Sequence, residues 1–411
     1  MPGDAEARAA VLAGRARARR RRRAVAGVLS ALALVGAGQW WAGTQDTSAV
    51  ALEQSADEPV DPPLDGGSEA GARAPETAGD APAPAPEAVP PEEPVAVPAP
   101  GDRTPTGEPV TLAFGGDVHA EGGSGAALAA GLPTFRAQLS APDLTVVNLE
   151  TAITERGTAA PKQFAFRAPE SVLTRLKEAG VDVVSVANNH GLDYGQQGLS
   201  DTLAAGARAG LPMVGIGTDA AAAHAPHVAE VRGQRIAVLG ATQVLDSNLE
   251  QAWTAGDDSP GMASAKQPER LLAEVARVRA EVDTVVVFLH WGEERNPCPL
   301  PRQQELARQL VDAGADVVVG SHAHVLLGGG YLDGAYVDYG LGNFVFAGRS
   351  AESRRTGLLT LTLQGRAVTD AVWTPAVVQD GAPVALEGQA AVDAVADKAA
   401  RRGCTDLAAA P

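Results

Sequence analysis

Hydrophobic residues gather in short runs along residues 110–345, and each run ends abruptly in polar residues. Six such runs are VTLAFGGDVH, LTVVNLE, VDVVSVANNH, DTVVVFLHWGEE, ADVVVGSHAH and AYVDYGLGNF. Stretches such as TVVVFL are apolar at every position, which is typical of strands covered on both faces. The pattern therefore predicts six buried strands with polar residues at their carboxyl ends.

Apolar residues recur at helical spacing between these runs, in 168–180, 198–210, 266–282 and 301–314. Several of these segments close on a glycine, which favours the left-handed backbone found just after many helices. Strands that alternate with helices indicate βαβ units and a mostly parallel sheet.

Two other segments lack this alternation. Residues 227–240, HVAEVRGQRIAVLG, have the pattern of a hairpin, and residues 356–378 have that of antiparallel strands. Adding them to the parallel strands predicts an α/β domain over 110–380. It would contain a mixed sheet or two packed sheets, with helices outside.

The amino-terminal part has a different pattern. Residues 1–23 are a basic head, and residues 24–43 are an apolar stretch that contains Trp40 and Trp41 near its end. A spanning helix needs roughly 20 apolar residues, and preceding arginines keep that end in the cytoplasm. We interpret 24–43 as a single-pass signal anchor in the cell membrane, with a cleaved signal peptide as the alternative. Both place the main domain outside the cytoplasm.

Residues 44–109 contain 14 of the 29 prolines and 14 acidic residues. Such a segment favours extended conformations and repels itself through its charge. We expect a disordered linker that holds the domain off the membrane, and we treat residues 381–411 as a C-terminal tail.

The formal net charge of −17 bears on the partners. Residues 110–411 carry a net charge of −11 and contain no basic stripe. Binding to a nucleic-acid backbone depends on clustered lysine and arginine. We therefore expect no nucleic-acid partner.

The chain has two cysteines, Cys298 and Cys404. An exported protein can keep a disulfide, and this one would tie the tail to the segment after His290. The sequence leaves the pairing open.

Five of the seven histidines lie at the predicted strand ends, whereas His224 and His227 lie in a loop and are assigned no role. The imidazole and oxygen ligands at these ends suit Mn, Fe, Zn or Mg, and no thiolate is among them. The candidate metal ligands are Asp117, His119, Glu150, Asn189, His290, His322 and His324.

The GSHAHV segment holds two of these ligands at alternate positions. Side chains alternate along an extended segment, so His322 and His324 would face one cavity. A carboxylate at a neighbouring strand end could bridge two cations, which clamp the two oxygens of a phosphoryl displacement. A histidine that is not a ligand could donate a proton to the leaving group.

Each of these signals is weak by itself. An aspartate after a strand is usually a turn or cap residue, and a lone histidine is more often a core or surface residue than a ligand. The ANNHG segment alone could be an asparagine turn. Six polar clusters, all at predicted strand ends, favour a shared site.

The segments GDVHAEG, NLETAIT, VANNHGLDYGQQG, HWGEE, GADVVVGSHAHV and YGLGNFVF, in this order, resemble the CapA family of capsule and poly-γ-glutamate synthesis proteins. That family belongs to the calcineurin-like metallophosphoesterase superfamily. The resemblance covers about residues 110–380. It implies a four-layer α/β/β/α sandwich of mixed sheets and two divalent metal ions.

The resemblance also implies roles for individual residues. His190 matches the superfamily's catalytic histidine, and Glu150 lies where a metal-bridging aspartate is usual. Asn188 stands where the superfamily has a glycine. Four polar residues in the matching segments are further candidates for the site: Asn148, Asn188, Asp193 and Asn343.

The resemblance implies a membrane-tethered protein that acts in capsule or poly-γ-glutamate synthesis, export or anchoring. Its partners would be an anionic cell-surface polymer or a phosphoester substrate, together with membrane proteins of capsule synthesis. A metal-dependent hydrolase is expected. Two alternatives stay open: a general extracellular phosphodiesterase or phosphatase, and a non-catalytic cell-surface scaffold.

Overall fold

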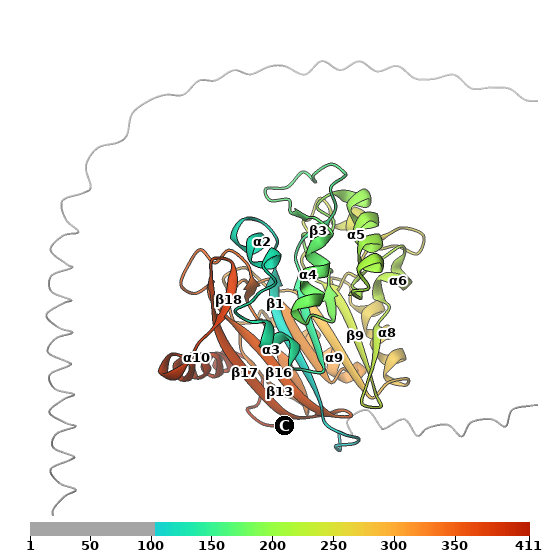
Figure 1. Cartoon of the computed structure of the whole chain (residues 1–411). Helices are drawn as coiled ribbons and strands as arrows, with labels where there is room; N and C mark the ends of the chain where they lie inside the picture. Colours follow the sequence, from blue (N-terminus) through green and yellow to red (C-terminus); the bar gives the residue numbers. More distant parts are fainter. Residues whose placement is uncertain (1–102) are drawn as a thin grey trace, which may run out of the picture. The chain divides into compact units, whose positions relative to one another are not determined.

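The computed structural model describes residues 103–411, shown in colour in Figure 1. The predicted head and signal anchor, and residues 44–102 of the predicted linker, lie outside these described residues. Within 103–411, no helix is both long enough and apolar enough to span a membrane.

One sheet has eight strands, with a parallel centre and antiparallel strands on one side. Strands β1, β2, β5 and β6 are parallel, β15 pairs in parallel with β1, and β16, β17 and β18 add antiparallel pairs. The strands are β1 (Val110–Val118), β2 (Leu144–Leu149), β5 (Val183–Ser185), β6 (Met213–Val214), β15 (Asn343–Val345), β16 (Arg355–Gln364), β17 (Ala367–Gln379) and β18 (Ala382–Ala385).

The second sheet has six strands in the order β13-β14-β12-β11-β9-β8. Its four central strands are parallel, and the two edge strands are antiparallel to their neighbours. The strands are β8 (His227–Val231), β9 (Gln234–Thr242), β11 (Thr284–His290), β12 (Val317–Ser321), β13 (Gly329–Leu332) and β14 (Ala335–Asp338). Both sheets are mixed, as predicted.

Helices and two small strand pairs complete the described part. The helices are α2 (Gly122–Ala129), α3 (Arg136–Ser140), α4 (Ser171–Ala179), α5 (Gly195–Ala209), α6 (Ala220–His224), α7 (Glu250–Trp253), α8 (Glu269–Arg279), α9 (Pro301–Ala313), α10 (Gly388–Ala400) and the 3-10 helix η1 (Arg401–Cys404). The small pairs join β3 (Ala152–Ile153) to β4 (Arg167–Ala168), and β7 (Ile216–Gly217) to β10 (Gly261–Met262).

Three hydrophobic clusters show how these elements pack. The first joins the outer face of the eight-stranded sheet to α2, α3, α4 and α5, and the second joins the six-stranded sheet to α8 and α9. The third lies between the sheets and includes Phe114 of β1 and Phe288 of β11, both fully buried. Strands such as β1 and β11 are apolar on both faces because both faces are buried. Burying one large apolar side chain stabilises the fold by roughly 1.5–3 kcal/mol.

The predicted helices and antiparallel segments are confirmed at closely similar positions. Helices α4, α5 and α9 each end at a glycine with positive φ, as at Gly314, where φ is 113°. Strands β8 and β9 form the predicted hairpin, and β16 pairs with β17 over most of its length.

The prediction of one strand through AYVDYGLGNF is wrong. Strand β14 ends at Asp338 in the six-stranded sheet, and β15 starts at Asn343 in the eight-stranded sheet. Gly342, with φ of 65°, lies in the crossing, and a Cβ on Gly116 would come within 1.9 Å of its carbonyl oxygen. Glycines at both positions let the chain change sheets beside β1.

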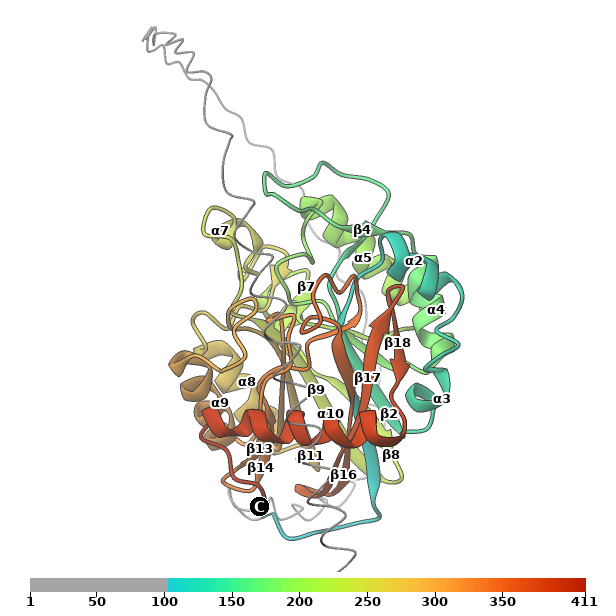
Figure 2. The ribbon, with the colours of Figure 1, turned by 90° about the vertical axis from the view of Figure 1, so that its left-hand side faces the viewer.

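Residues 381–411 pack against the domain. Figure 2 shows α10 crossing the front of the view. Lys398 of α10 lies 2.8 Å from Asp338 of β14, and its ammonium lies 5.0 Å from the ring of Trp373 in β17. Cys298 and Cys404 form a disulfide. This helix therefore contacts strands of both sheets.

Candidate metal centre

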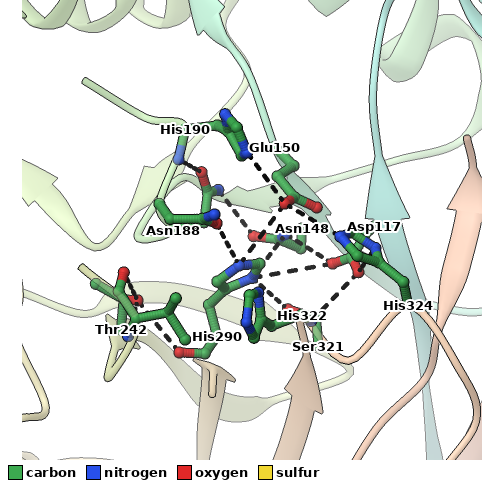
Figure 3. A network of polar contacts seen from close by, with 12 residues as sticks. Asp117, Asn148, Glu150, Asn188, His190, Thr242, His290, Ser321, His322 and His324 are labelled. Atoms are coloured by element: carbon green, nitrogen blue, oxygen red, sulfur yellow. Dashed lines mark hydrogen bonds and ion pairs between the residues drawn. The ribbon is translucent and has the colours of Figure 1, made fainter. Parts of the chain in front are cut away.

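The carboxyl ends of five parallel strands bring the predicted polar residues together (Figure 3). Asp117 ends β1, and Glu150 and Asn189 follow β2 and β5 of the same sheet. His290 ends β11 and His322 follows β12 in the other sheet. Ligands from two packed sheets therefore meet at one edge, where open α/β sheets usually bind ligands.

Glu150 lies at the centre of this group. Its side chain is fully buried, and neither carboxylate oxygen accepts a hydrogen bond within the described residues. The Nε2 atoms of His290 and His324 each lie 3.8 Å from Glu150 Oε1, and that of His190 lies 3.9 Å away. A buried carboxylate without a partner is costly, so this geometry calls for a cation or a proton.

Two sets of three side chains could each hold a metal ion. One set is Glu150, His290 and His322, and the other is Asp117, Glu150 and His324, with ligand atoms within 4.8 Å of one another. Glu150 belongs to both sets. Atoms bound about 2.1 Å from one ion lie roughly 3.4–4 Å apart at tetrahedral or wider angles, so the more distant of these atoms would have to move together to bind one divalent cation.

Amide side chains hold the carboxylate of Asp117 in place. Asn148 Nδ2 donates to Asp117 Oδ1 at 2.9 Å, and Asn188 Nδ2 donates to Asn148 Oδ1 at 3.1 Å. Asn188 Nδ2 also donates to the carbonyl of Leu149, directly before Glu150. Asn148 and Asn188 therefore orient two candidate ligands.

His290 is oriented on both ring nitrogens. Its Nε2 lies 2.8 Å from Asn189 Oδ1, so Asn189 lies at the metal centre. Its Nδ1 lies 3.0 Å from Ser321 Oγ. The tautomer that binds a cation through Nε2 carries its proton on Nδ1. Ser321 could accept that proton, and the Asn148 amide, whose Nδ2 lies 3.2 Å from Nδ1, would have to turn its N–H away.

The expectation that His322 and His324 project from an extended segment is wrong. Strand β12 ends at Ser321, and the two histidines have φ values of 92° and 54°. Both nevertheless reach Asp117, because His322 N–H donates to Oδ2 at 3.2 Å and His324 Nδ1 lies 3.2 Å from the same oxygen. The two histidines therefore lie in a turn with strained, positive φ values and not in a strand with alternating side chains.

Asn343 reaches this turn from β15. Its Oδ1 lies 2.8 Å from His324 Nδ1, and its Nδ2 donates to the carbonyl of Ser353. Asn343 therefore orients His324 from the start of a strand, although the sequence pattern places it at a strand end.

The ionisation of the centre follows from its burial. Burial lowers the pKa of His290 well below its usual range and, with the charge of His324, lowers that of His322 to about 3. Burial and the charge of Asp117 raise the pKa of Glu150. Burial alone would lower the pKa of His324, but Glu150 and Asp117 raise it to about 10. In the metal-free protein, the His324–Glu150 pair therefore retains a proton that a cation would displace.

His119 lies beside the centre but outside both sets of ligands. Its Nδ1 is 3.3 Å from Ser124 Oγ, and its ring contacts those of Phe166 and Phe346, with centroids 4.4 and 4.9 Å away. Burial and the charges of neighbouring histidines lower its pKa to about 4. A neutral imidazole packed between aromatic rings is part of the wall of the site.

His190 also belongs to neither set of ligands, and it contacts the same Phe166 ring as His119. Its Nδ1 lies 2.6 Å from Asp193 Oδ2, and its ring stacks on Phe166 with centroids 4.1 Å apart. Burial lowers its pKa, although Asp193 opposes the shift. Asp193 and Phe166 thus fix an imidazole whose free edge faces the centre.

The sequence analysis missed Phe166, Phe346 and Lys162. Lys162 lies 3.0 Å from Asp193 and donates to the carbonyl of Asn189. Phe166 and Lys162 lie between β3 and β4, in a segment without strand or helix periodicity, so no pattern in the chain pointed to them. Phe346 is the last residue of the YGLGNFVF segment, and that position was a usable signal.

Comparisons with known proteins agree with the earlier resemblance. Residues 111–348 match the family model described as bacterial capsule synthesis protein PGA_cap. The chain is 36% identical to the capsule biosynthesis protein CapA of Bacillus anthracis over 230 residues, which are 54% of each chain. It is 33% identical to the PGA biosynthesis protein CapA of Bacillus subtilis over 258 residues, 62% of this chain and 66% of that one. The matches thus span about half to two thirds of these relatives' length.

Two solved structures are also similar in part. A phosphatase from Mycoplasma pneumoniae aligns with a TM-score of 0.41 and 15% identity over 66% of this chain and 95% of its own. A 5'-nucleotidase from Candida albicans aligns with a TM-score of 0.40 and 10% identity over 75% of this chain and 55% of its own.

Proposed function

Since the chain belongs to the bacterial capsule synthesis protein family PGA_cap, we propose that it works in the synthesis, export or anchoring of a capsule or poly-γ-glutamate polymer. The apolar stretch 24–43 would tether it to the cell membrane, with the amino terminus in the cytoplasm. The part of the predicted linker before Arg103 would place the domain on the outer side, since Arg103 itself packs on the domain beside Asp316. An anionic cell-surface polymer or a phosphoester would be the substrate, and membrane proteins of capsule synthesis would be its partners.

The proposed centre holds two divalent cations in a metallophosphoesterase-type sandwich. Glu150 would be shared between them, with His290 and His322 on one ion and Asp117 and His324 on the other. Oxygen and imidazole ligands suit Mn, Fe, Zn or Mg. The observation that carries this proposal is the fully buried Glu150 carboxylate, which lacks hydrogen bonds and lies 3.8–3.9 Å from three imidazoles.

The proposed reaction is hydrolysis of a phosphoester. When bound, the two cations supply the electrostatic stabilisation for a phosphoryl displacement. His190 would protonate the leaving oxygen as an imidazolium, through Nε2–H, while its Nδ1 proton stays hydrogen-bonded to Asp193 at 2.6 Å. Asn148 and Asn188 keep Asp117 and the segment at Glu150 in place.

Metal analysis of the purified full chain tests this proposal. We expect about two equivalents of a transition metal or magnesium in the wild type, and clear losses in Glu150→Ala and His322→Ala. His224→Ala is the matched control, since His224 is a buried histidine hydrogen-bonded to Ala220 away from the centre. Wild-type protein that binds no metal, or retention of metal in both site variants, would contradict the proposal.

Measurements of phosphodiester turnover and of the amount of surface polymer distinguish three roles: a polymer-specific protein, a general phosphodiesterase and a scaffold. A polymer-specific protein should leave generic phosphodiesters almost untouched while its deletion alters surface polymer. A general phosphodiesterase should hydrolyse them in a metal-dependent reaction that His190→Ala abolishes. A scaffold should support normal surface polymer even after His190→Ala and His322→Ala.

A further inference from the structure

The segment between β3 and β4 packs over His190 through a lysine. The side chain of Lys162 is only 8% exposed, and its Nζ lies 3.0 Å from Asp193 Oδ1 and 3.5 Å from Asp246 Oδ2. The ammonium also lies 5.2 Å from the centre of the Trp253 ring. A buried lysine loses solvation and side-chain entropy, so these contacts must hold it in place.

Asp193 is held by groups on three sides. The Phe166 N–H donates to Oδ2 at 2.6 Å, His190 Nδ1 lies 2.6 Å from the same oxygen, and Lys162 lies beside Oδ1. An aspartate fixed in this way accepts a hydrogen bond from Nδ1–H of His190 and so favours the tautomer that is protonated on Nδ1. The Nε2 atom of His190 is then the ring nitrogen that faces Glu150, 3.9 Å away.

Lys162 also reaches the ligand side of the same turn. Its Nζ donates to the carbonyl oxygen of Asn189, whose side-chain oxygen lies 2.8 Å from His290 Nε2. One ammonium group therefore contacts both the residue that orients His190 and a candidate metal ligand. Lys162 itself lies outside all the sequence segments that predicted the site.

We propose that Lys162 is a positioning residue for His190: it holds Asp193 and the Asn189 turn so that His190 keeps one tautomer and one ring orientation toward the metal centre. The inference rests on the proposed function, because His190 matters as a proton donor only if the centre is catalytic. Asp246 is 43% exposed and keeps contact with water, whereas Asp193 is fully buried. Removing the ammonium should therefore disturb Asp193 first.

The first test reads the His190 ring directly and needs no turnover. The full chain is labelled with ¹⁵N-histidine, and two-bond ¹H–¹⁵N correlations report which ring nitrogen carries the proton. The His190 signals are assigned with His190→Gln. We expect neutral wild-type His190 to carry its single proton on Nδ1, in the metal-free and the zinc-loaded protein. Nε2 is then free to take up the proton that it later donates. In Lys162→Met, its signals should indicate exchange between both tautomers.

Two further variants control this measurement. Lys162→Arg should keep the wild-type pattern, because a guanidinium can also reach Asp193. Lys266→Met is the matched control: Lys266 contacts the carbonyl of Leu245 and the carboxylate of Glu250 but no residue of the centre. If Lys162→Met unfolds the protein, Lys162→Gln takes its place. Wild-type His190 signals in these Lys162 variants, or equal changes in Lys266→Met, would overturn the inference.

The second test uses the leaving group of the substrate. Proton donation contributes most when the leaving oxygen is strongly basic. With zinc or manganese present, Lys162→Met should lower turnover of an alkyl phosphodiester by at least about tenfold, and that of a nitrophenyl diester much less. Equal losses on both substrates would count against positioning of His190. If the wild type hydrolyses neither, the proposed reaction fails, while the tautomer measurement still decides the role of Lys162.

Discussion

The two ends of strand β12 both border buried carboxylates, but the protein neutralises them differently. At the amino end, Asp316 is fully buried and lies 2.9 Å from Arg366, with Arg279 and Arg103 also paired to it. Beyond the carboxyl end, Glu150 is equally buried. Within residues 103–411, no lysine or arginine nitrogen lies within ion-pair distance of it, and three imidazoles surround it instead.

This difference separates a structural carboxylate from a functional one. A buried charge is tolerated when the fold supplies its counter-charge, as three arginines do for Asp316. At Glu150 the fold supplies imidazoles and a proton, and a bound cation could take the place of that proton. Both carboxyl groups are fully buried, so exposure alone would not tell the two ends apart.

Removing the Asp316 carboxylate at the amino end should have the largest effect on folding stability. We expect Asp316→Asn to lower the free energy of unfolding by about 3–5 kcal/mol, since it leaves buried arginines without their carboxylate. Urea or guanidinium denaturation measures this change. Metal content per folded molecule should stay at the wild-type value, and a loss of metal with unchanged stability would reverse the assignment of the two ends.

Replacing Glu150 beyond the carboxyl end should affect metal binding more than folding. Glu150→Gln removes the ligand shared by both sets, so we expect metal affinity to fall by at least about 100-fold, beyond the usual effect of supporting residues. The metal-free variant should lose less free energy of unfolding than Asp316→Asn, because Glu150 faces titratable imidazoles whereas Asp316 faces permanently charged arginines. Titration calorimetry and denaturation check the two parts separately. A metal-free variant that loses as much stability as Asp316→Asn would mean that Glu150 is a structural residue like Asp316.

The response to pH should also distinguish the metal-free from the metal-loaded centre. The pKa of His324 is raised to about 10, so its proton stabilises the metal-free fold fully below pH of about 6.5. This stabilisation is lost as the pH rises toward 10, by up to about 1.4 kcal/mol for each pH unit. Bound metal displaces the proton and removes the loss. Denaturation at pH 7, 8 and 9, with and without chelator, measures it. If the free energy of unfolding of the metal-free protein rises from pH 7 to pH 9, His324 does not retain the proton.

Sequence patterns located the strand ends well because periodicity and burial are local properties of the chain. Five parallel strands could be placed in this way, and Asp117, Glu150 and His290 followed from their positions after apolar runs. The HAH turn could not be predicted, because the positive φ values of His322 and His324 depend on Asp117 and Asn343 from the other sheet.

Other contacts are also non-local. Asn343 reaches the centre only because two glycines let the chain cross between sheets after Asp338. Lys162 comes from a segment without periodicity, and its partners Asp193 and Asp246 lie far along the chain. Such residues are brought to the site by packing, so they carry no local signal of their role.

The smallest expected effect concerns His119, at the margin of the centre. The D-x-H spacing makes it a candidate ligand, whereas the structure packs its ring beside Phe166 and Phe346 and outside both sets of ligands. We therefore expect His119→Gln to weaken metal binding by less than about tenfold, which is within the range of a supporting residue. His322→Ala in the same calorimetric titration provides the reference for a true ligand. Equal losses in the two variants would place His119 in the first coordination sphere. The metal would then have to draw its ring away from the aromatic pair and toward Glu150.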